Sequence, residues 1–183
     1  MKTFNITEKT KSGVAYTIRD LDKKDVEALL SYVNKLSREK TFVLLQGEQL
    51  TLKEEKEFVQ KLTKDMRGRK AVCLVIETDK KIIGISQINL KPRANSHVGQ
   101  MGISVDAQFR DQGLGKLLLN TIIDQGIKNI PELKIIDLSC FVVNEKALHM
   151  YKSVGFMEYG RLPGGIKYKG NYINEIFMYK VVR

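Results

Sequence analysis

The chain has 183 residues, a length typical of one domain, and its 43% hydrophobic and 28% charged residues exclude a disordered or fibrous protein. The 31 Lys and Arg residues outnumber the 21 Asp and Glu residues, which gives a formal charge of +10. Such an excess is typical of proteins that meet an anionic partner, whether nucleic acid, a membrane surface or a phosphate-bearing cofactor.

The first 70 residues predict one strand followed by two helices. Alternation of apolar residues predicts a strand near residues 14–19. Apolar residues then recur at helical spacing after Asp22, an acidic residue that suits a helix N-terminus. Thr51 and Glu54 form a capping box ahead of the second helix. The densest basic cluster, between Lys61 and Lys70, is expected to be the solvated end of that helix.

The middle of the chain predicts three strands. Two β-rich runs, residues 71–76 and 82–90, are joined by a turn and predict a hairpin. A further strand at 98–105 contains Gly99 and Gly102, and glycine inside a strand predicts a bulge or a close backbone approach.

The last third predicts a helix, a strand, a second helix and a terminal hairpin. The first helix is expected to end near Gly126, and the next strand spans residues 135–143. A strand, a helix and a second strand in succession imply a parallel crossover. The second helix is expected to start at Asn144 and to end at Gly155.

A glycine-containing loop connects the strand at 98–105 to the helix after it. Helix N-termini present unpaired N–H groups and positive potential, so the small residues Gly113 and Gly115 could let a phosphate reach those donors. Arg110 and Lys116 add formal charge. The glycines by themselves are equally consistent with a tight turn that binds nothing.

Two familiar phosphate loops do not match this segment. A Walker A loop would need glycine at the position of Arg110 and Ser or Thr at that of Leu117. A dinucleotide fingerprint would need glycine or alanine at the position of Leu118.

A second constellation follows the next strand, with the pattern Asn144-x-x-Ala147-x-x-x-Tyr151-x-x-x-Gly155-Phe156. If the two strands are parallel neighbours, the loops after them emerge at the same sheet edge, where ligands of open α/β sheets bind. One site would then include both motifs.

The two motifs in this order resemble those of the GNAT superfamily of N-acetyltransferases, and the resemblance covers residues 14–182. It implies a single α/β domain over residues 1–183 with its core at about 14–182. The implied sheet is mixed and mostly antiparallel, has a central parallel strand pair at the cofactor cleft, and is flanked by helices.

The resemblance also implies a co-substrate, acetyl-CoA, and a set of residues that bind it. The pantetheine arm would run along the backbone of Ile103, Ser104 and Val105, and Asn144 would contact the arm from the other side. Tyr151 falls where many members of the family place the acid that protonates the departing thiolate. The loop would hold the pyrophosphate through Arg110, Asp111, Gln112, Gly113, Leu114, Gly115 and Lys116.

The base that deprotonates the acceptor amine stays open. Some members of the family use a carboxylate on the strand before the loop, but residues 98–105 contain none. Glu77 and Glu175 are candidate bases, and each is also readily explained as a solvated or substrate-contacting carboxylate. His97 and His149 fit structural or exposed positions better.

We therefore expect an acyltransferase that moves an acetyl group from acetyl-CoA directly to a primary amine of a small molecule or a protein. Two rivals remain: a basic module that binds nucleic acid or the ribosome, which has no recognition motif behind it, and a non-catalytic CoA-binding sensor of the same fold. Neither the acceptor nor the oligomeric state is readable, so a homodimer stays open.

The sequence also leads to expectations about the state of the cysteines and the cellular location. Cys73 and Cys140 lie in apolar runs without metal-ligand spacing, which favours buried reduced thiols and no metal site. The first residues contain no apolar stretch of the kind found in signal peptides, and no run approaches the roughly 18 apolar residues needed to span a bilayer. We expect a cytoplasmic protein without membrane contact.

Overall fold

A computed structural model describes residues 4–10 and 12–183, and the chain divides into two compact units. The first unit comprises Met1–Asn89 and Gly102–Pro131, and the second comprises Leu90–Met101 and Glu132–Arg183. The expectation of a single domain over residues 1–183 stays a prediction, and residues 1–3 and 11 of that range lie outside the described part.

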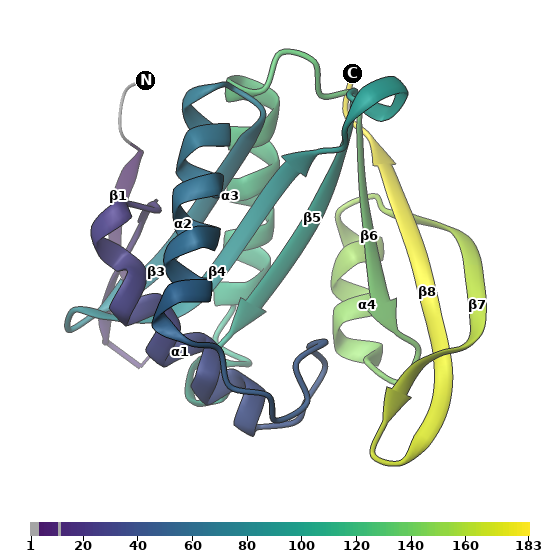
Figure 1. The fold of residues 1–183 in the computed structure, drawn as a ribbon, viewed down its shortest axis with the longest axis horizontal. Coiled ribbons are helices and arrows are strands. Elements are labelled where there is room, and N and C mark those ends of the chain that lie inside the picture. Colours follow the sequence, from purple (N-terminus) through teal and green to yellow (C-terminus); the bar gives the residue numbers. More distant parts are fainter. Residues whose placement is uncertain (1–3, 11) are drawn as a thin grey trace. The chain divides into compact units, whose positions relative to one another are not determined.

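The described residues form a mixed sheet with the strand order β1-β2-β3-β4-β5-β6-β8-β7 (Figure 1). The strands are β1 (Asn5–Lys9), β2 (Ala15–Asp20), β3 (Ala71–Thr78), β4 (Lys81–Leu90), β5 (Val98–Val105), β6 (Ile135–Phe141), β7 (Met157–Tyr168) and β8 (Asn171–Val181). The helices are α1 (Val26–Arg38), α2 (Leu52–Arg67), α3 (Leu114–Asn129) and α4 (Glu145–Ser153).

The predicted crossover between β5 and β6 is confirmed. Val98 to Gln100 pair in parallel with Ile135 to Asp137, and α3 connects the two strands. The pairs β1–β2, β2–β3, β3–β4, β6–β8 and β7–β8 are antiparallel. The expected mixed, mostly antiparallel α/β sheet is therefore present.

The first unit is layered around β3, which is buried along nearly its whole length. Alternate residues such as Cys73 and Val75 join a cluster with Leu29 of α1 and Val59 of α2. The residues between them point to the opposite face of the sheet, and α3 packs against β3 with a buried stripe that includes Leu118. A strand covered on both faces reads as a continuous apolar run, which explains the sequence of β3.

The first two helices begin as their caps predict. Asp22 accepts a hydrogen bond from the Lys24 N–H in a capping box with Asp25, ahead of the 3₁₀ turn that leads into α1. Thr51 and Glu54 form the second capping box at α2. The basic residues of the Lys61 to Lys70 cluster are exposed at the end of α2, as expected.

The second unit contains α4 and the strands β6, β8 and β7. Leu138 of β6 and Met178 of β8 are paired and buried, and Lys180 of β8 donates a hydrogen bond from Nζ to the carbonyl of Val154 at the end of α4. This face of the strands therefore lies toward α4. Gly155, with φ of +90°, ends the helix at the predicted position.

One strand and two element boundaries differ from the sequence-based expectations. β1 carries exposed polar residues at all but one position and is held by main-chain pairing with β2, so apolar alternation does not reveal it. α3 continues past Gly126, which is buried in the helix, to Asn129. β6 ends at Phe141 rather than at residue 143.

Two further features agree with the sequence. Cys73 and Cys140 are free and buried. Over the residues described, no helix combines the length and apolar character required to cross a bilayer.

Glu55 is an exception to the apolar pattern of α2. It lies one turn before Val59 on the buried face of the helix, is 2% exposed, and its Oε1 is buried without a hydrogen-bond partner among the described residues. Burial raises the pKa of the Glu55 carboxyl to about 6. The ionised form is therefore destabilising at neutral pH, because the unfolded chain ionises this group more readily.

We predict that Glu55→Gln increases the free energy of unfolding by about 1–2 kcal/mol at pH 7.5. The folded state holds the Glu55 proton up to a higher pH than the unfolded state does, so the wild type gains stability relative to the variant as pH falls from about 6 towards 4.5. Urea unfolding at pH 7.5 and pH 5 measures both values. The exposed Glu57→Gln serves as the control, and a Glu55→Gln effect that is absent or independent of pH would contradict the assignment.

Candidate active site

The loop between β5 and α3 lies in the first unit and is built from two turns. Asp106 accepts a hydrogen bond from the Gln108 N–H at 3.0 Å and so caps the 3₁₀ turn Ala107–Phe109. The chain then passes through Asp111 and Gly113, which have φ of +61° and +85°. Gly113 is the N-cap of α3, and a left-handed conformation at this point is what glycine supplies without strain.

The start of α3 differs from the starts of α1 and α2. The first turn of α3 contains no acidic residue, whereas those of α1 and α2 do, and Gly113 has no side chain that could cap the helix. The first main-chain bond back to the loop runs from the Leu117 N–H to the Gly113 carbonyl at 3.1 Å, so the preceding N–H groups lack intrahelical acceptors. A β-carbon built at Gly113 would meet no atom within 4 Å, and Lys116 is exposed. This helix terminus therefore presents open N–H donors beside a positive charge.

At the end of β5, the main-chain N–H and C=O groups of successive residues point to opposite edges of the strand. The Gly102 carbonyl accepts from Ser86 Oγ at 2.9 Å, and the Asp106 N–H donates to the Ile83 carbonyl at 2.8 Å, so these residues turn their main-chain groups toward β4. Main-chain groups alternate along a strand, so those of Ile103 and Val105 point to the opposite edge. The Val105 carbonyl accepts from Arg110 Nε at 2.9 Å.

The sequence predicts a bulge or a close backbone approach at Gly102, and the close approach is found at Gly84 of β4 instead. A β-carbon at Gly84 would come within 3.2 Å of the Ser104 carbonyl oxygen, whereas one at Gly102 would meet nothing within 4 Å. Gly102 thus presents open space on its side-chain direction, and Gly84 allows the close strand contact.

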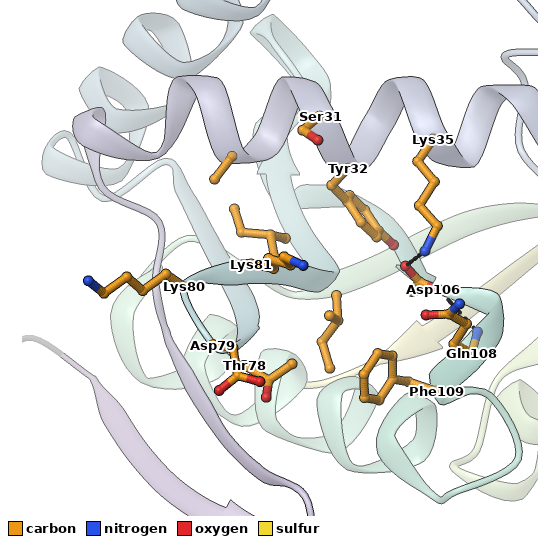
Figure 2. Close-up of a pocket in the computed structure, with 13 residues that line it drawn as sticks. Ser31, Tyr32, Lys35, Thr78, Asp79, Lys80, Lys81, Asp106, Gln108 and Phe109 are labelled. Atoms are coloured by element: carbon orange, nitrogen blue, oxygen red, sulfur yellow. Dashed lines mark hydrogen bonds and ion pairs between the residues drawn. The ribbon is translucent and has the colours of Figure 1, made fainter.

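Helix α1 and its C-cap residue Glu39 contribute three side chains that hold this region and that the sequence-based reasoning did not identify. Each forms one contact with the end of β5 or with the loop, and Figure 2 shows Tyr32 and Lys35 among them. The contacts are Tyr32 Oη to Ser104 Oγ at 2.9 Å, Lys35 Nζ to Asp106 Oδ2 at 2.5 Å, and Arg110 to Glu39 Oε2 at 2.7 Å. The spacing of 3 and then 4 residues along α1 puts all three on one helix face, a polar stripe that could be found in the sequence.

A pocket of about 320 Å³ lies beside these contacts, between α1, the β3–β4 turn and the start of the loop (Figure 2). Lys35 and Asp106 form its polar wall, and Phe109 and Ile83 contribute apolar surface. Asp106 is 4% exposed, so its carboxylate depends on Lys35 and on the turn N–H for charge compensation.

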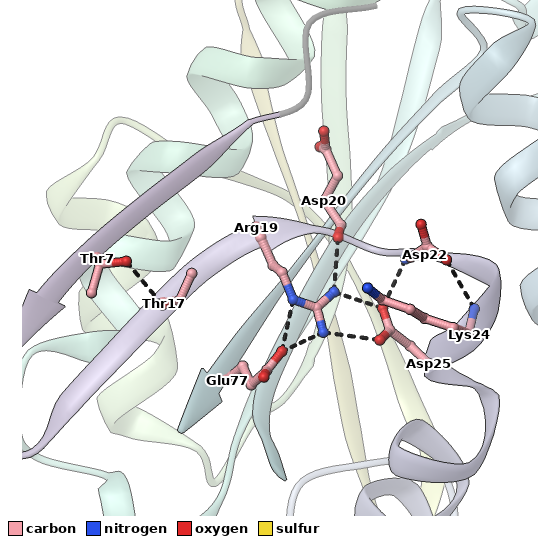
Figure 3. Close-up of polar contacts among 8 residues, drawn as sticks. All are labelled: Thr7, Thr17, Arg19, Asp20, Asp22, Lys24, Asp25 and Glu77. Atoms are coloured by element: carbon pink, nitrogen blue, oxygen red, sulfur yellow. Dashed lines mark hydrogen bonds and ion pairs between the residues drawn. The ribbon is translucent and has the colours of Figure 1, made fainter. Parts of the chain in front are cut away.

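Glu77 belongs to a separate ion-pair network (Figure 3). Arg19 Nε donates to Glu77 Oε2 at 2.7 Å, and the same guanidinium donates to Asp25 Oδ2 at 2.7 Å and to the Asp20 carbonyl at 3.1 Å. The hydrogen bond to Asp25, opposed in part by burial and reinforced by Glu77, raises the pKa of Arg19 above its ordinary value. The network ties β2, β3 and the turn before α1 together, which gives Glu77 a structural partner.

The second unit holds the other two predicted site residues at the two ends of α4. Asn144 is the N-cap, and its Oδ1 accepts from the Ala147 N–H at 3.3 Å. Tyr151 is 7% exposed, and its ring meets that of Phe156 edge-on with centroids 5.8 Å apart. Among the described residues, the Tyr151 hydroxyl has no hydrogen-bond partner. Burial, with a smaller contribution from Cys140, raises the pKa of Tyr151 above its ordinary value, so the phenol is protonated.

The cysteines and histidines do not add reactive groups. Burial raises the pKa of the Cys140 thiol to about 11 and that of the Cys73 thiol further, which keeps both protonated at neutral pH. His97 and His149 are exposed. No cluster of three or more His, Cys, Asp and Glu residues suited to a metal ion occurs in the described part of the chain.

The predicted site residues thus form one continuous segment in the first unit and one helix in the second. Ile103, Ser104 and Val105 end β5, Arg110, Asp111, Gln112 and Gly113 form the loop, and Leu114, Gly115 and Lys116 make the first turn of α3. Gln112 also accepts from Ser12 Oγ at 3.1 Å, and Leu114 is buried. The first segment can bind an anion through main-chain donors, and the second offers a neutral phenol.

Comparison with known proteins gives consistent matches. Residues 34–156 match the model of the acetyltransferase (GNAT) family. L-amino acid N-acetyltransferase AaaT from Escherichia coli (strain K12) is 31% identical over 121 residues, which cover 64% of this chain and 71% of AaaT.

Solved structures agree. An acetyltransferase of the GNAT family from Streptococcus pneumoniae superposes with a TM-score of 0.83 and 27% identity, covering 92% of this chain and 99% of the other. The Salmonella typhimurium protein yncA, solved with its cofactor acetyl-CoA, has the same fold, with a TM-score of 0.78, 16% identity and coverage of 92% and 94%. The chain belongs to the GNAT family of acetyltransferases.

Proposed function

We propose that this protein is an N-acetyltransferase that moves an acetyl group from acetyl-CoA directly to a primary amine of a small molecule or a protein. Family membership supports the acyltransferase activity and the use of acetyl-CoA. The proposal adds that the transfer to the amine is direct, and it assigns the residues that carry it out.

The start of α3 is the observation that carries the proposal. A diphosphate needs N–H donors, positive potential and room for its oxygens. Gly113 leaves the room, the uncapped first turn supplies the donors, and the exposed ammonium of Lys116 supplies a charge. Arg110 contributes by holding the loop to Glu39 and to the Val105 carbonyl rather than by offering a free guanidinium.

The remaining contacts to acetyl-CoA follow from main-chain direction and side-chain donors. In this proposal the pantetheine arm bonds to the main chain of Ile103 and Val105 at the strand edge that does not face β4. Asn144 uses its carbonyl oxygen for the cap, which leaves its amide N–H groups as donors for the arm.

Tyr151 is proposed as the residue that stabilises the sulfur as the C–S bond breaks. Ordinary pKa values, about 10 for a phenol and 8.5 for a thiol, make full proton transfer from phenol to thiolate unfavourable, and burial of Tyr151 widens the gap. The hydroxyl therefore acts first as a hydrogen-bond donor to the developing negative charge. Sulfur gains one proton overall and the amine nitrogen loses one, so Tyr151 ends each turnover protonated.

The deprotonation of the amine is not assigned to Glu77, because that carboxylate is the ion-pair partner of Arg19. AaaT is named for L-amino acids, and an amino acid acceptor is one class to test here. Polyamines and protein N-termini are the others.

The proposed function predicts release of CoA thiol from acetyl-CoA in the presence of an amine. The assay should compare L-amino acids, polyamines and short peptides with free N-termini, and mass spectrometry should identify the N-acetylated product. Cofactor binding without turnover across the whole panel would favour the sensor and contradict the enzyme. Salt-sensitive affinity for polynucleotides without turnover would favour the nucleic-acid module.

We predict that Gly113→Val weakens acetyl-CoA binding at least about tenfold. A β-branched side chain at φ of +85° strains the loop and occupies the space in which we place the pyrophosphate. The matched control is Gly170→Val in the β7–β8 turn, where φ is +82° and a β-carbon also meets nothing within 4 Å. Calorimetry should give a loss of affinity in Gly113→Val only, whereas both variants should lose stability. Unchanged affinity in a folded Gly113→Val protein would remove the loop from the site.

We predict that Tyr151→Phe lowers kcat at least about tenfold and leaves acetyl-CoA affinity nearly unchanged, because the ring is kept and only the donor is lost. The measurement requires conditions in which chemistry limits the rate. Tyr16→Phe removes the hydroxyl of another buried tyrosine, one that donates to Glu8 at 3.0 Å, and should keep the wild-type kcat. Wild-type turnover in Tyr151→Phe would return this residue to a packing role.

A further inference from the structure

The second unit has a sheet face that α4 does not cover. Met178 and Lys180 of β8 point toward α4, so Glu175, Phe177 and Tyr179 lie on the opposite face. Their direct partners on β6 are Phe141, Ser139 and Asp137. We call the set Asp137, Ser139, Tyr159, Glu175, Phe177 and Tyr179 the open face.

A β-bulge brings a third aromatic ring to the open face. The pairing between β7 and β8 shifts from Glu158↔Met178 to Gly160↔Phe177, which leaves Tyr159 as the extra residue. Its ring lies 6.1 Å from that of Phe177 and 5.9 Å from that of Tyr179 between centroids, and Tyr159 is 55% exposed. Bulges commonly re-aim a side chain next to a functional site.

Charged groups border these rings. Lys91 forms an ion pair with Asp137 Oδ2, but Oδ1 of the same carboxylate is buried and has no hydrogen-bond partner among the described residues. The pKa of Tyr159 is raised by burial and by the charge of Asp137, and Lys91 opposes this shift, so both charges act on the ring. No ion-pair partner of Glu175 occurs in the part of the chain that the structure describes.

These features match one kind of ligand. The half-buried carboxylate of Glu175, which lies two residues from Phe177 on this face, attracts a cationic N–H donor, and aromatic faces attract an ammonium group or stack on a flat apolar group. An anion would meet two carboxylates here and only one cation, which is already paired. A flexible polycation would pair with the carboxylates, but it has no flat apolar group to pack against the aromatic rings.

We propose that the open face recognises the acceptor as a primary amine carried on a planar apolar body, with the amine at Glu175 and the body against Tyr159 and Phe177. The inference rests on the proposed function for the role of this ligand as acceptor. The binding step itself is independent of acetyl transfer.

Calorimetric titration of the full chain with phenethylamine, L-phenylalanine and spermidine tests the inference. The ring-bearing probes should bind at least about tenfold more tightly than spermidine. Both probes carry a primary amine on an aromatic ring. Tighter binding of L-phenylalanine than of phenethylamine would identify an amino acid, and equal binding would identify a simple amine.

Two variants test the residues directly. Tyr159→Ala and Glu175→Gln should each weaken binding of the ring-bearing probes at least about fivefold. Tyr159→Leu keeps an apolar side chain at the bulge, so it guards against loss of folding in the alanine variant. The matched control is Tyr172→Ala, which removes a 73% exposed tyrosine from the other face of β8 and should bind as the wild type does.

The outcomes separate this inference from the proposed function. Absence of acetyl-CoA turnover with every amine would contradict the proposed function, whatever the titrations give. Turnover with equal affinity for spermidine, or wild-type affinity in Tyr159→Leu and Glu175→Gln, would overturn the inference alone. A change in oligomeric state in these variants without a change in probe binding would assign the open face to a contact between copies of the chain, which also overturns it.

Discussion

The ion pair between Lys35 and Asp106 connects helix α1 to the start of the β5–α3 loop. Asp106 ends β5, caps the turn that opens the loop, and is almost fully buried, so its negative charge is tolerated only because Lys35 and a turn N–H compensate it. Tyr32 and Glu39 extend the same helix face on either side of Lys35. The position of Gly113 and of the first turn of α3 thus depends on a helix that is distant from them in sequence.

The parts of the fold that sequence reasoning predicts are those encoded by local physics. The capping box of Thr51 and Glu54 fixes where α2 starts, because both partners lie within one turn of each other. The glycine loop is legible for the same reason, since a left-handed N-cap and an unpaired first turn need only local residues. Our prediction for Gly113→Val therefore begins from the sequence, and the structure adds its matched control.

The parts that sequence reasoning missed depend on partners far along the chain. The stripe of Tyr32, Lys35 and Glu39 has meaning only once residues about 70 positions away are beside it. β1 exists because β2 offers main-chain groups, and Tyr159 becomes a bulge only in register with β8. An acceptor surface built from such features leaves no compact motif, which explains why the candidate cofactor residues are readable from the sequence and the acceptor is not.

The division into units affects how the chain folds during synthesis and how its fragments behave. The chain passes between the units three times, at residues 89–90, 101–102 and 131–132, so neither unit is a continuous segment. During synthesis, β3 is complete well before α3, and the face of β3 that α3 covers stays exposed until about 50 further residues have been added. A fragment that stops before residue 114 would keep the loop up to Gly113 and the strands β1 to β5 but would lose α3, which packs on β3, so expression of isolated halves should give aggregation rather than two working pieces.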